Sequence, residues 1–213
     1  MNATLSLFLI VTVLLDFLAL GSSRMRVLIQ TVGVQGALLG LMPLLHESVP
    51  GVRVILLCLL TVSVKGFVIP SMLFRAIREV HIRREVEPLL GFIPSLILGA
   101  VGTGLAVIFA DSLPLVSGQH GTLVASVSFA TILTGFIMLT TRQKAITQVV
   151  GYLILENGVF VFGLLLIDAM PILVELAVLL DVLVGVFVMG IIINHIRLTF
   201  SSLDTAHLTS LKE

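Results

Sequence analysis

The chain has 213 residues, of which 58% are hydrophobic and 11% are charged, and its formal net charge is zero. With a mean hydropathy of +1.20, this composition excludes a soluble globular domain, which would expose far too much apolar surface. The single cysteine, Cys58, excludes an intramolecular disulfide and a cysteine-ligated cluster within this chain. The sequence therefore predicts an all-α, polytopic membrane protein, with residues 1–213 forming a single integral membrane domain.

Apolar stretches of about 20 residues are long enough to cross a hydrocarbon core as helices. The sequence predicts seven, at residues 5–21, 27–45, 53–74, 89–110, 122–140, 145–167 and 172–194. No Lys or Arg precedes the first of them, whereas Arg24 and Arg26 follow it directly. A signal peptide has the opposite order of charge, so we interpret this stretch as a retained helix.

Basic residues alternate between the two sides of this arrangement. Arg53 is alone on one side, and the connections on the other side carry Arg24, Arg26, Arg75, Arg78, Arg83, Arg84, Arg142, Lys144, Arg197 and Lys212. Cytoplasmic connections are enriched in Lys and Arg. The pattern predicts seven transmembrane helices with the N-terminus outside and the C-terminus inside.

The second predicted span is rich in small residues, at spacings that let helices approach closely in lipid. These are Gly33, Gly36, Ala37 and Gly40. We interpret them as a packing face. In the same span, Gln30 and Gln35 are candidates for hydrogen bonds between helices.

The third span contains Lys65 at its centre and Pro70 five residues later. Proline cannot donate to the carbonyl of Gly66, and its ring favours a kink. Lys65 lies too far from either end to reach the interface easily. Two interpretations stay open: a structural ion pair with a neighbouring acid, or a proton-relay or gating cation. The polar run RAIREVHIRREVEP that follows predicts a short amphipathic helix ending at Pro88, on lipid headgroups or on a soluble partner.

The last two spans form a predicted hairpin that turns at residues 168–171. Glu156 and Asp181 lie about equally far from that turn, so at 1.5 Å per residue they reach nearly the same depth. A charge near the midplane costs about 2.5–3.5 kcal/mol on insertion scales, which makes such a residue a functional candidate. We assign Asp181, Glu156 and Lys65 to a candidate proton path. Glu175 is a further member nearer the outer surface.

Other polar residues are assigned no chemistry. Asp16 lies about one turn from the inner end of the first span, where it is expected to reach the interface. The histidines match no metal-ligand spacing. No motif indicates a catalytic centre, a cofactor or a metal, so the predicted site residues are limited to the proton path.

The segments GYLILENG (151–158), PILVELAVLLD (171–181) and LDTAHLTSLK (203–212), with Lys65 and Pro70, resemble the hydrogenase-4 component E family. Residues 122–213 also resemble the three-helix K subunit of respiratory complex I. There Asp181 matches a buried acid and Gly185 its glycine. The second acid of that subunit falls on Leu153, and Glu156 could replace it from one turn further on.

The resemblance implies a membrane-arm subunit of a complex I-related, multisubunit [NiFe]-hydrogenase of the formate hydrogenlyase type. It implies antiporter-like membrane subunits and a soluble hydrogenase arm as partners. We expect a bacterial or archaeal cytoplasmic membrane, with lipid and no nucleic acid in contact with the chain. Two alternatives stay open: a structural spacer that moves no protons, and an independent secondary transporter, which would predict inverted repeats.

Overall fold

The computed structural model describes residues 3–46, 51–79, 89–113 and 119–165, together with Gly185 and Gly190. Every regular element in these ranges is helical. The elements are α1 (Ala3–Gly21), α2 (Met25–His46), α3 (Val52–Ser63), the π-helical turn η1 (Val64–Val68), α4 (Ile69–Glu79), α5 (Phe92–Ser112), α6 (Gln119–Thr141) and α7 (Ala145–Leu164).

Within the described residues, six helices are long and apolar enough to cross a membrane. They agree with the first six predicted spans, with α3, η1 and α4 together forming the third. The seventh predicted span, 172–194, lies outside the described residues except for Gly185 and Gly190. The all-helical membrane fold is confirmed, and the count of seven stays a prediction.

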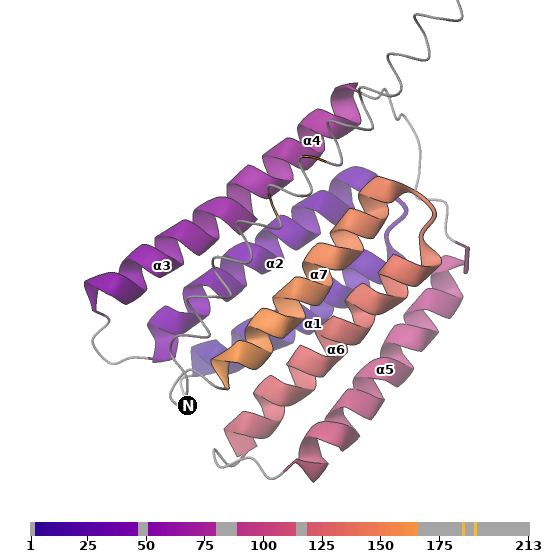
Figure 1. Cartoon of the computed structure of the whole chain (residues 1–213). Coiled ribbons are helices and arrows are strands. Elements are labelled where there is room, and N and C mark those ends of the chain that lie inside the picture. The colour runs from indigo at the N-terminus through magenta and orange to yellow at the C-terminus, as the bar shows by residue number, and fades with distance from the viewer. Residues whose placement is uncertain are drawn as a thin grey trace, which may run out of the picture.

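The helices run side by side along one common direction (Figure 1). α2 packs between the third span on one side and α7 on the other, and α6 separates α7 from α5. α1 packs against α2, α5 and α6. In this arrangement the last residues of α1, α4 and α6 and the first residues of α2, α5 and α7 lie at one end of the bundle, which we call the basic end. It carries Arg24, Arg26, Arg75, Arg78, Arg142 and Lys144.

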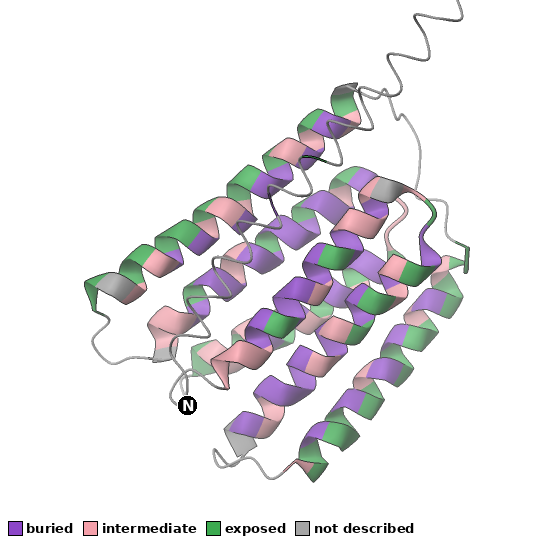
Figure 2. Cartoon of the chain, viewed as in Figure 1, coloured by how far each residue is buried: buried purple, intermediate pink, exposed green. Residues whose placement is uncertain are grey.

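The sides of α5 show how the bundle meets its surroundings. Its buried residues are small: Ser95, Gly99, Gly102, Ala106 and Ala110. The large side chains that it exposes are apolar and include Ile93, Ile97, Val101, Leu105 and Ile108. Small residues inside and large apolar residues outside are typical of a helix packed in lipid, the reverse of a water-soluble bundle. Figure 2 shows the exposed outer faces along α3 and α5.

The glycines of α2 make the close helix contact that the sequence predicts. A Cβ atom at Gly36 would lie 2.7 Å from Cβ of Lys65, and one at Gly33 would lie 2.8 Å from Cγ of Pro70. Gly40 makes a similarly close approach to Val62. The packing face is therefore confirmed, and it brings Lys65 against α2.

The third span accommodates Pro70 through a change of helix type. At η1 the backbone widens, and the N–H of Ile69 donates to the carbonyl of Val64, five residues back. π-turns of this kind occur frequently at functional sites. The first residues of the predicted amphipathic helix, 75–79, are helical and continue the third span as part of α4. Residues 80–88 lie outside the described ranges.

Two apolar clusters form the core, one nearer each end. The cluster towards the basic end consists of Ala19, Leu20, Leu28, Ile29, Val32, Ile69, Leu73, Ala76, Met138, Val150, Leu153 and Ile154. The other consists of Leu9, Leu39, Met42, Val124, Val127, Phe160 and Val161. Along α1, α2, α6 and α7, the residues between the two clusters include buried polar side chains. These define a polar layer across the bundle.

Candidate functional site: a buried polar layer

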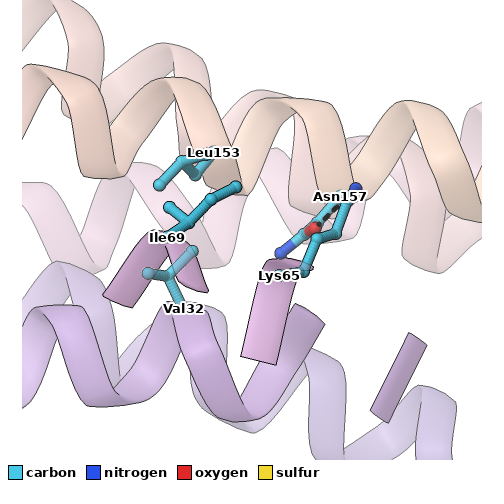
Figure 3. A pocket seen from close by; sticks show the side chains of 5 residues that line it. All are labelled: Val32, Lys65, Ile69, Leu153 and Asn157. Carbon is cyan, nitrogen blue, oxygen red and sulfur yellow. Dashed lines mark hydrogen bonds between the residues drawn. The ribbon is translucent and has the colours of Figure 1, made fainter. Parts of the chain in front are cut away.

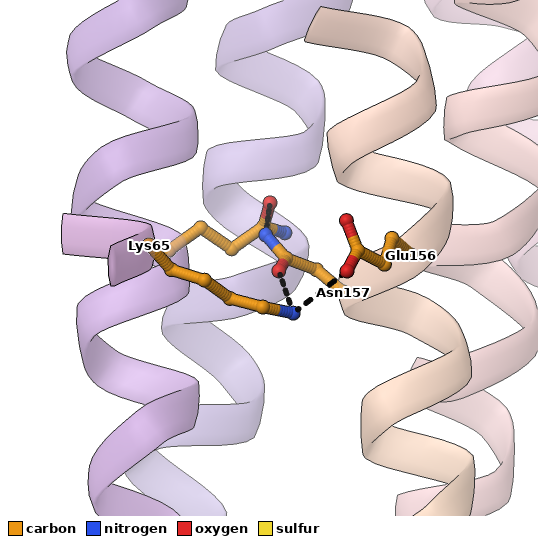
Figure 4. A network of polar contacts seen from close by, with 4 residues as sticks. Lys65, Glu156 and Asn157 are labelled. Carbon is orange, nitrogen blue, oxygen red and sulfur yellow. Dashed lines mark hydrogen bonds and ion pairs between the residues drawn. The ribbon is translucent and has the colours of Figure 1, made fainter. Parts of the chain in front are cut away.

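The centre of the polar layer is an ion pair between the third span and α7. Nζ of Lys65 lies 3.7 Å from Oε1 of Glu156, and the two residues are only 5% and 6% exposed. The same ammonium donates to Oδ1 of Asn157 at 3.3 Å, as Figure 4 shows. It also lies 5.2 Å from the ring centroid of Phe160, within reach of a cation–π contact.

The contact between α6 and α7 sets the rotation of α7. Gly151 and Gly158 are two turns apart and share a face. A Cβ at Gly158 would lie 2.7 Å from the backbone nitrogen of Ile132, and one at Gly151 would lie 2.9 Å from Cβ of Met138. Because this face must lie against α6, the neighbouring positions Glu156 and Asn157 are turned towards α2 and η1.

Hydrogen bonds continue the layer from Asn157 to α2. Nδ2 of Asn157 donates to Oε1 of Gln35 at 3.2 Å. Nε2 of Gln35 then donates to Oδ1 of Asp16 on α1 at 2.9 Å. The hydroxyl of Thr131 on α6 donates to Oδ2 of Asp16 at 2.7 Å. The layer therefore connects α1, α2, η1, α6 and α7 through side chains that are all buried.

A small cavity lies beside the ion pair, with a volume of about 10 Å³. Its lining is formed by Val32, Lys65, Ile69, Leu153 and Asn157 (Figure 3). A space of this size is at the lower limit for one water molecule. Leu153 lines this cavity one turn before Asn157.

A second buried cation lies at the basic end. Arg142 is 1% exposed, and its Nη2 donates to the carbonyl of Leu20 at 2.7 Å. The guanidinium carbon lies 5.1 Å from the ring centroid of Phe92 on α5. Burial lowers the pKa of Arg142, but a guanidinium starts high enough to stay charged. Arg142 therefore joins the last turn of α1 to α5 and α6.

The structure brings together two of the predicted proton-path residues, Lys65 and Glu156. The other two, Asp181 and Glu175, lie outside the described residues. Gln35 makes the predicted bond between helices, whereas Gln30 is exposed. Whether any of these residues carries protons stays a prediction.

Asp16 corrects an expectation. It does not reach the membrane interface. Its side chain is buried, with 2% exposed, and accepts hydrogen bonds from side chains on α2 and α6. The number of residues between Asp16 and the end of α1 does not give the distance of Asp16 from the interface, because Leu20 at that end is itself buried beneath Arg142. Nothing in the sequence distinguishes Thr131 from the other hydroxyl residues of α6. The only signal for Asp16 was that no other charged residue interrupts the first span.

The fold and the polar layer define a multi-pass helical membrane protein with acidic and basic groups in its interior. The chain is 32% identical over 205 residues to the uncharacterized protein Rv0085 of Mycobacterium tuberculosis, covering 94% of this chain and 92% of that protein. It belongs to the same family as Rv0085. No family model and no solved structure matches the chain.

A second similarity covers part of the chain. Hydrogenase-4 component E of Escherichia coli strain K12 is 31% identical over 100 residues, which are 47% of this chain and 45% of that protein. The component E protein of Shigella flexneri matches to the same extent. The match spans less than half the length of these relatives and supports a distant relation between them and the chain.

Proposed function

We propose that this protein is a membrane-arm subunit of a multisubunit, hydrogenase-type complex related to complex I. In this proposal its buried polar layer forms part of a proton or ion path. The partial similarity to hydrogenase-4 component E supports the first statement. The contact between Lys65 and Glu156 in the interior is the observation that carries the second.

Proton relays in membrane proteins are built from ionisable residues that face the interior of the bundle. Lys65 and Glu156 meet this condition, and the apolar clusters on either side separate them from both ends of the bundle. With little water to screen them, the charge of each group depends strongly on that of the other. A change in a neighbouring subunit could therefore move a proton between them. We include Asp181 and Glu175 in this path on sequence grounds.

The proposed topology has seven spans, with the N-terminus outside and the C-terminus inside. The gathering of Arg24, Arg26, Arg75, Arg78, Arg142 and Lys144 at the basic end supports it, because cytoplasmic connections are rich in Lys and Arg. The proposed location is the cytoplasmic membrane of a bacterium or archaeon. Redox chemistry is assigned to a soluble [NiFe]-hydrogenase arm, and antiporter-like subunits are the proposed neighbours in the membrane.

The test compares Glu156→Gln and Asp181→Asn with Asp111→Asn, which removes an exposed carboxyl near the end of α5. Proton transport is measured in membrane vesicles, and assembly is measured by affinity purification of the complex. We expect Glu156→Gln and Asp181→Asn each to reduce transport about tenfold or more with normal assembly. Asp111→Asn should change neither. Normal transport in Glu156→Gln would contradict the proposed path.

A structural spacer is the second candidate, and the ion pair also favours it, because such a pair can fix how helices pack without moving protons. This candidate expects normal transport in the Glu156→Gln variant whenever assembly is normal. An independent transporter remains a further alternative. It expects the purified chain to move its substrate without any partner, which the same affinity purification followed by reconstitution would reveal.

A further inference from the structure

Asp16 is a buried acid of the polar layer, but the function proposed above gives it no specific task. It is the only charged residue of α1, and both of its carboxyl oxygens accept hydrogen bonds. The helices packed against α1 are α2, α5 and α6. Their titratable residues stand at or next to helix ends: Arg26, His46, Asp111 and His120. The cation to which Asp16 is connected by hydrogen bonds is Lys65.

That connection has a direction. Lys65 donates to Asn157, Asn157 donates to Gln35, and Gln35 donates to Asp16. Each amide accepts from the side of the ammonium and donates towards the carboxylate, so the two amide dipoles are aligned between opposite charges. Chains of hydrogen bonds polarise one another in this way. Glu156 contacts the same ammonium directly, so one cation serves two carboxyl groups.

We propose that Asp16 on α1 and Glu156 on α7 act as a coupled pair of carboxyl groups, which shares Lys65 and holds one exchangeable proton. With both acids ionised, these three residues carry one negative charge in excess, and a buried charge in excess is costly. One proton taken from water onto either carboxylate removes the excess, and no other bond breaks. Its role in transport rests on the function proposed above, whereas proton sharing can be measured separately.

Thr131 suits such an exchange. A hydroxyl can donate to an ionised carboxylate and, after rotation, accept from a protonated one. Asp16 can therefore be satisfied in either charge state without a rearrangement of helices. An acid held only by fixed backbone donors would lack this freedom.

Infrared difference spectroscopy against pH tests the pair in the full chain, in lipid nanodiscs with any partners that copurify. The carboxyl band of Glu156 is identified by its loss in Glu156→Gln. We expect Asp16→Asn to lower the pH midpoint of this band by about 0.5–1 pH unit, because a coupled negative charge is removed. In a Gln35→Leu background the same substitution should have little effect.

Two variants serve as controls. Gln30→Leu makes the matching change at an exposed position of α2, and Asp111→Asn removes an exposed acid of α5. Both should leave the midpoint in place.

An unchanged midpoint in Asp16→Asn, or an equal response with and without Gln35, would overturn the shared proton. If Asp16→Asn fails to fold, the Gln35→Leu variant alone tests the shared proton, because loss of the hydrogen bonds of Gln35 should itself move the midpoint of the Glu156 band. Normal transport in Glu156→Gln, with the midpoint still shifted in Asp16→Asn, would reject the proposed transport function and leave the pair intact.

Discussion

Lys65 and Arg142 are both buried cations, but the bundle accommodates them in different ways. Lys65 lies in the middle, against the carboxylate of Glu156 and within the polar layer. Arg142 lies at the basic end, where a backbone carbonyl and the face of Phe92 contact it. The first cation contacts one group that can change charge, the carboxylate of Glu156. The contacts described for the second are with groups that cannot.

The difference separates two uses of buried charge. Lysine releases its proton far more readily than arginine when its surroundings change, so a lysine beside an acid is suited to a relay. Arginine keeps its charge, and here it satisfies the carbonyl of Leu20 in the last turn of α1, where a cation also interacts favourably with the helix dipole. We therefore expect substitutions at Lys65 to affect transport and stability, and those at Arg142 to affect stability alone.

The largest expected effect comes from removing the central cation. Lys65→Met removes the cation that contacts Glu156 and should lower the free energy of unfolding by about 3–5 kcal/mol. Cys58 offers a built-in probe, since it is a free thiol and only 3% exposed. Thermal unfolding in detergent is followed by a thiol-reactive dye that labels Cys58 when the bundle opens.

A second substitution tests whether the loss arises from the pair. In Lys65→Met with Glu156→Gln both charges are gone, so most of the lost stability should return while transport stays low. If the double variant is as unstable as Lys65→Met, the cost comes from packing of the lysine stem against Gly36 and not from an unpaired charge.

A reciprocal exchange of the two cation types has an intermediate effect. Lys65→Arg keeps the positive charge but should reduce transport about tenfold or more at normal assembly, because the guanidinium does not give up its proton. Arg142→Lys should cost about 0.5–2 kcal/mol of stability through the weaker contact with Phe92, and leave transport unchanged. Transport in vesicles and Cys58 labelling report the two quantities. Equal transport in both variants would remove the distinction between the sites.

The six spans among the described residues and the central cation could be predicted because their signals are local. A run of apolar residues defines each helix, and a charge within it is costly wherever the helix packs, which singled out Lys65 and Glu156. The glycines of α2 likewise predicted a close contact. These inferences require the helix period and the energy of transfer into lipid, but no knowledge of which helices are neighbours.

The remaining members of the layer depend on how helices pack. Depth counted along α1 alone places Asp16 near the membrane interface, whereas Arg142 covers the end of that helix. Thr131 resembles any other hydroxyl on an apolar helix until α1 is packed beside α6. Asn157 joins the layer because Gly151 and Gly158 fix the rotation of α7. Such side chains become visible only with the tertiary contacts.

The smallest expected effect compares two hydroxyls of α6. Thr131 bonds across to Asp16, whereas Thr141, at the basic end, bonds the carbonyl of Ile137 in its own helix. Thr131→Val should cost about 0.6 kcal/mol, the average for hydrogen bonds between helices in membranes, and should shift the pH dependence of transport, because Asp16 loses a partner. Thr141→Val, a matched change, removes no bond between helices. It should leave Cys58 labelling and the pH profile unchanged, and an equal response in both variants would mean that Thr131 acts only through packing.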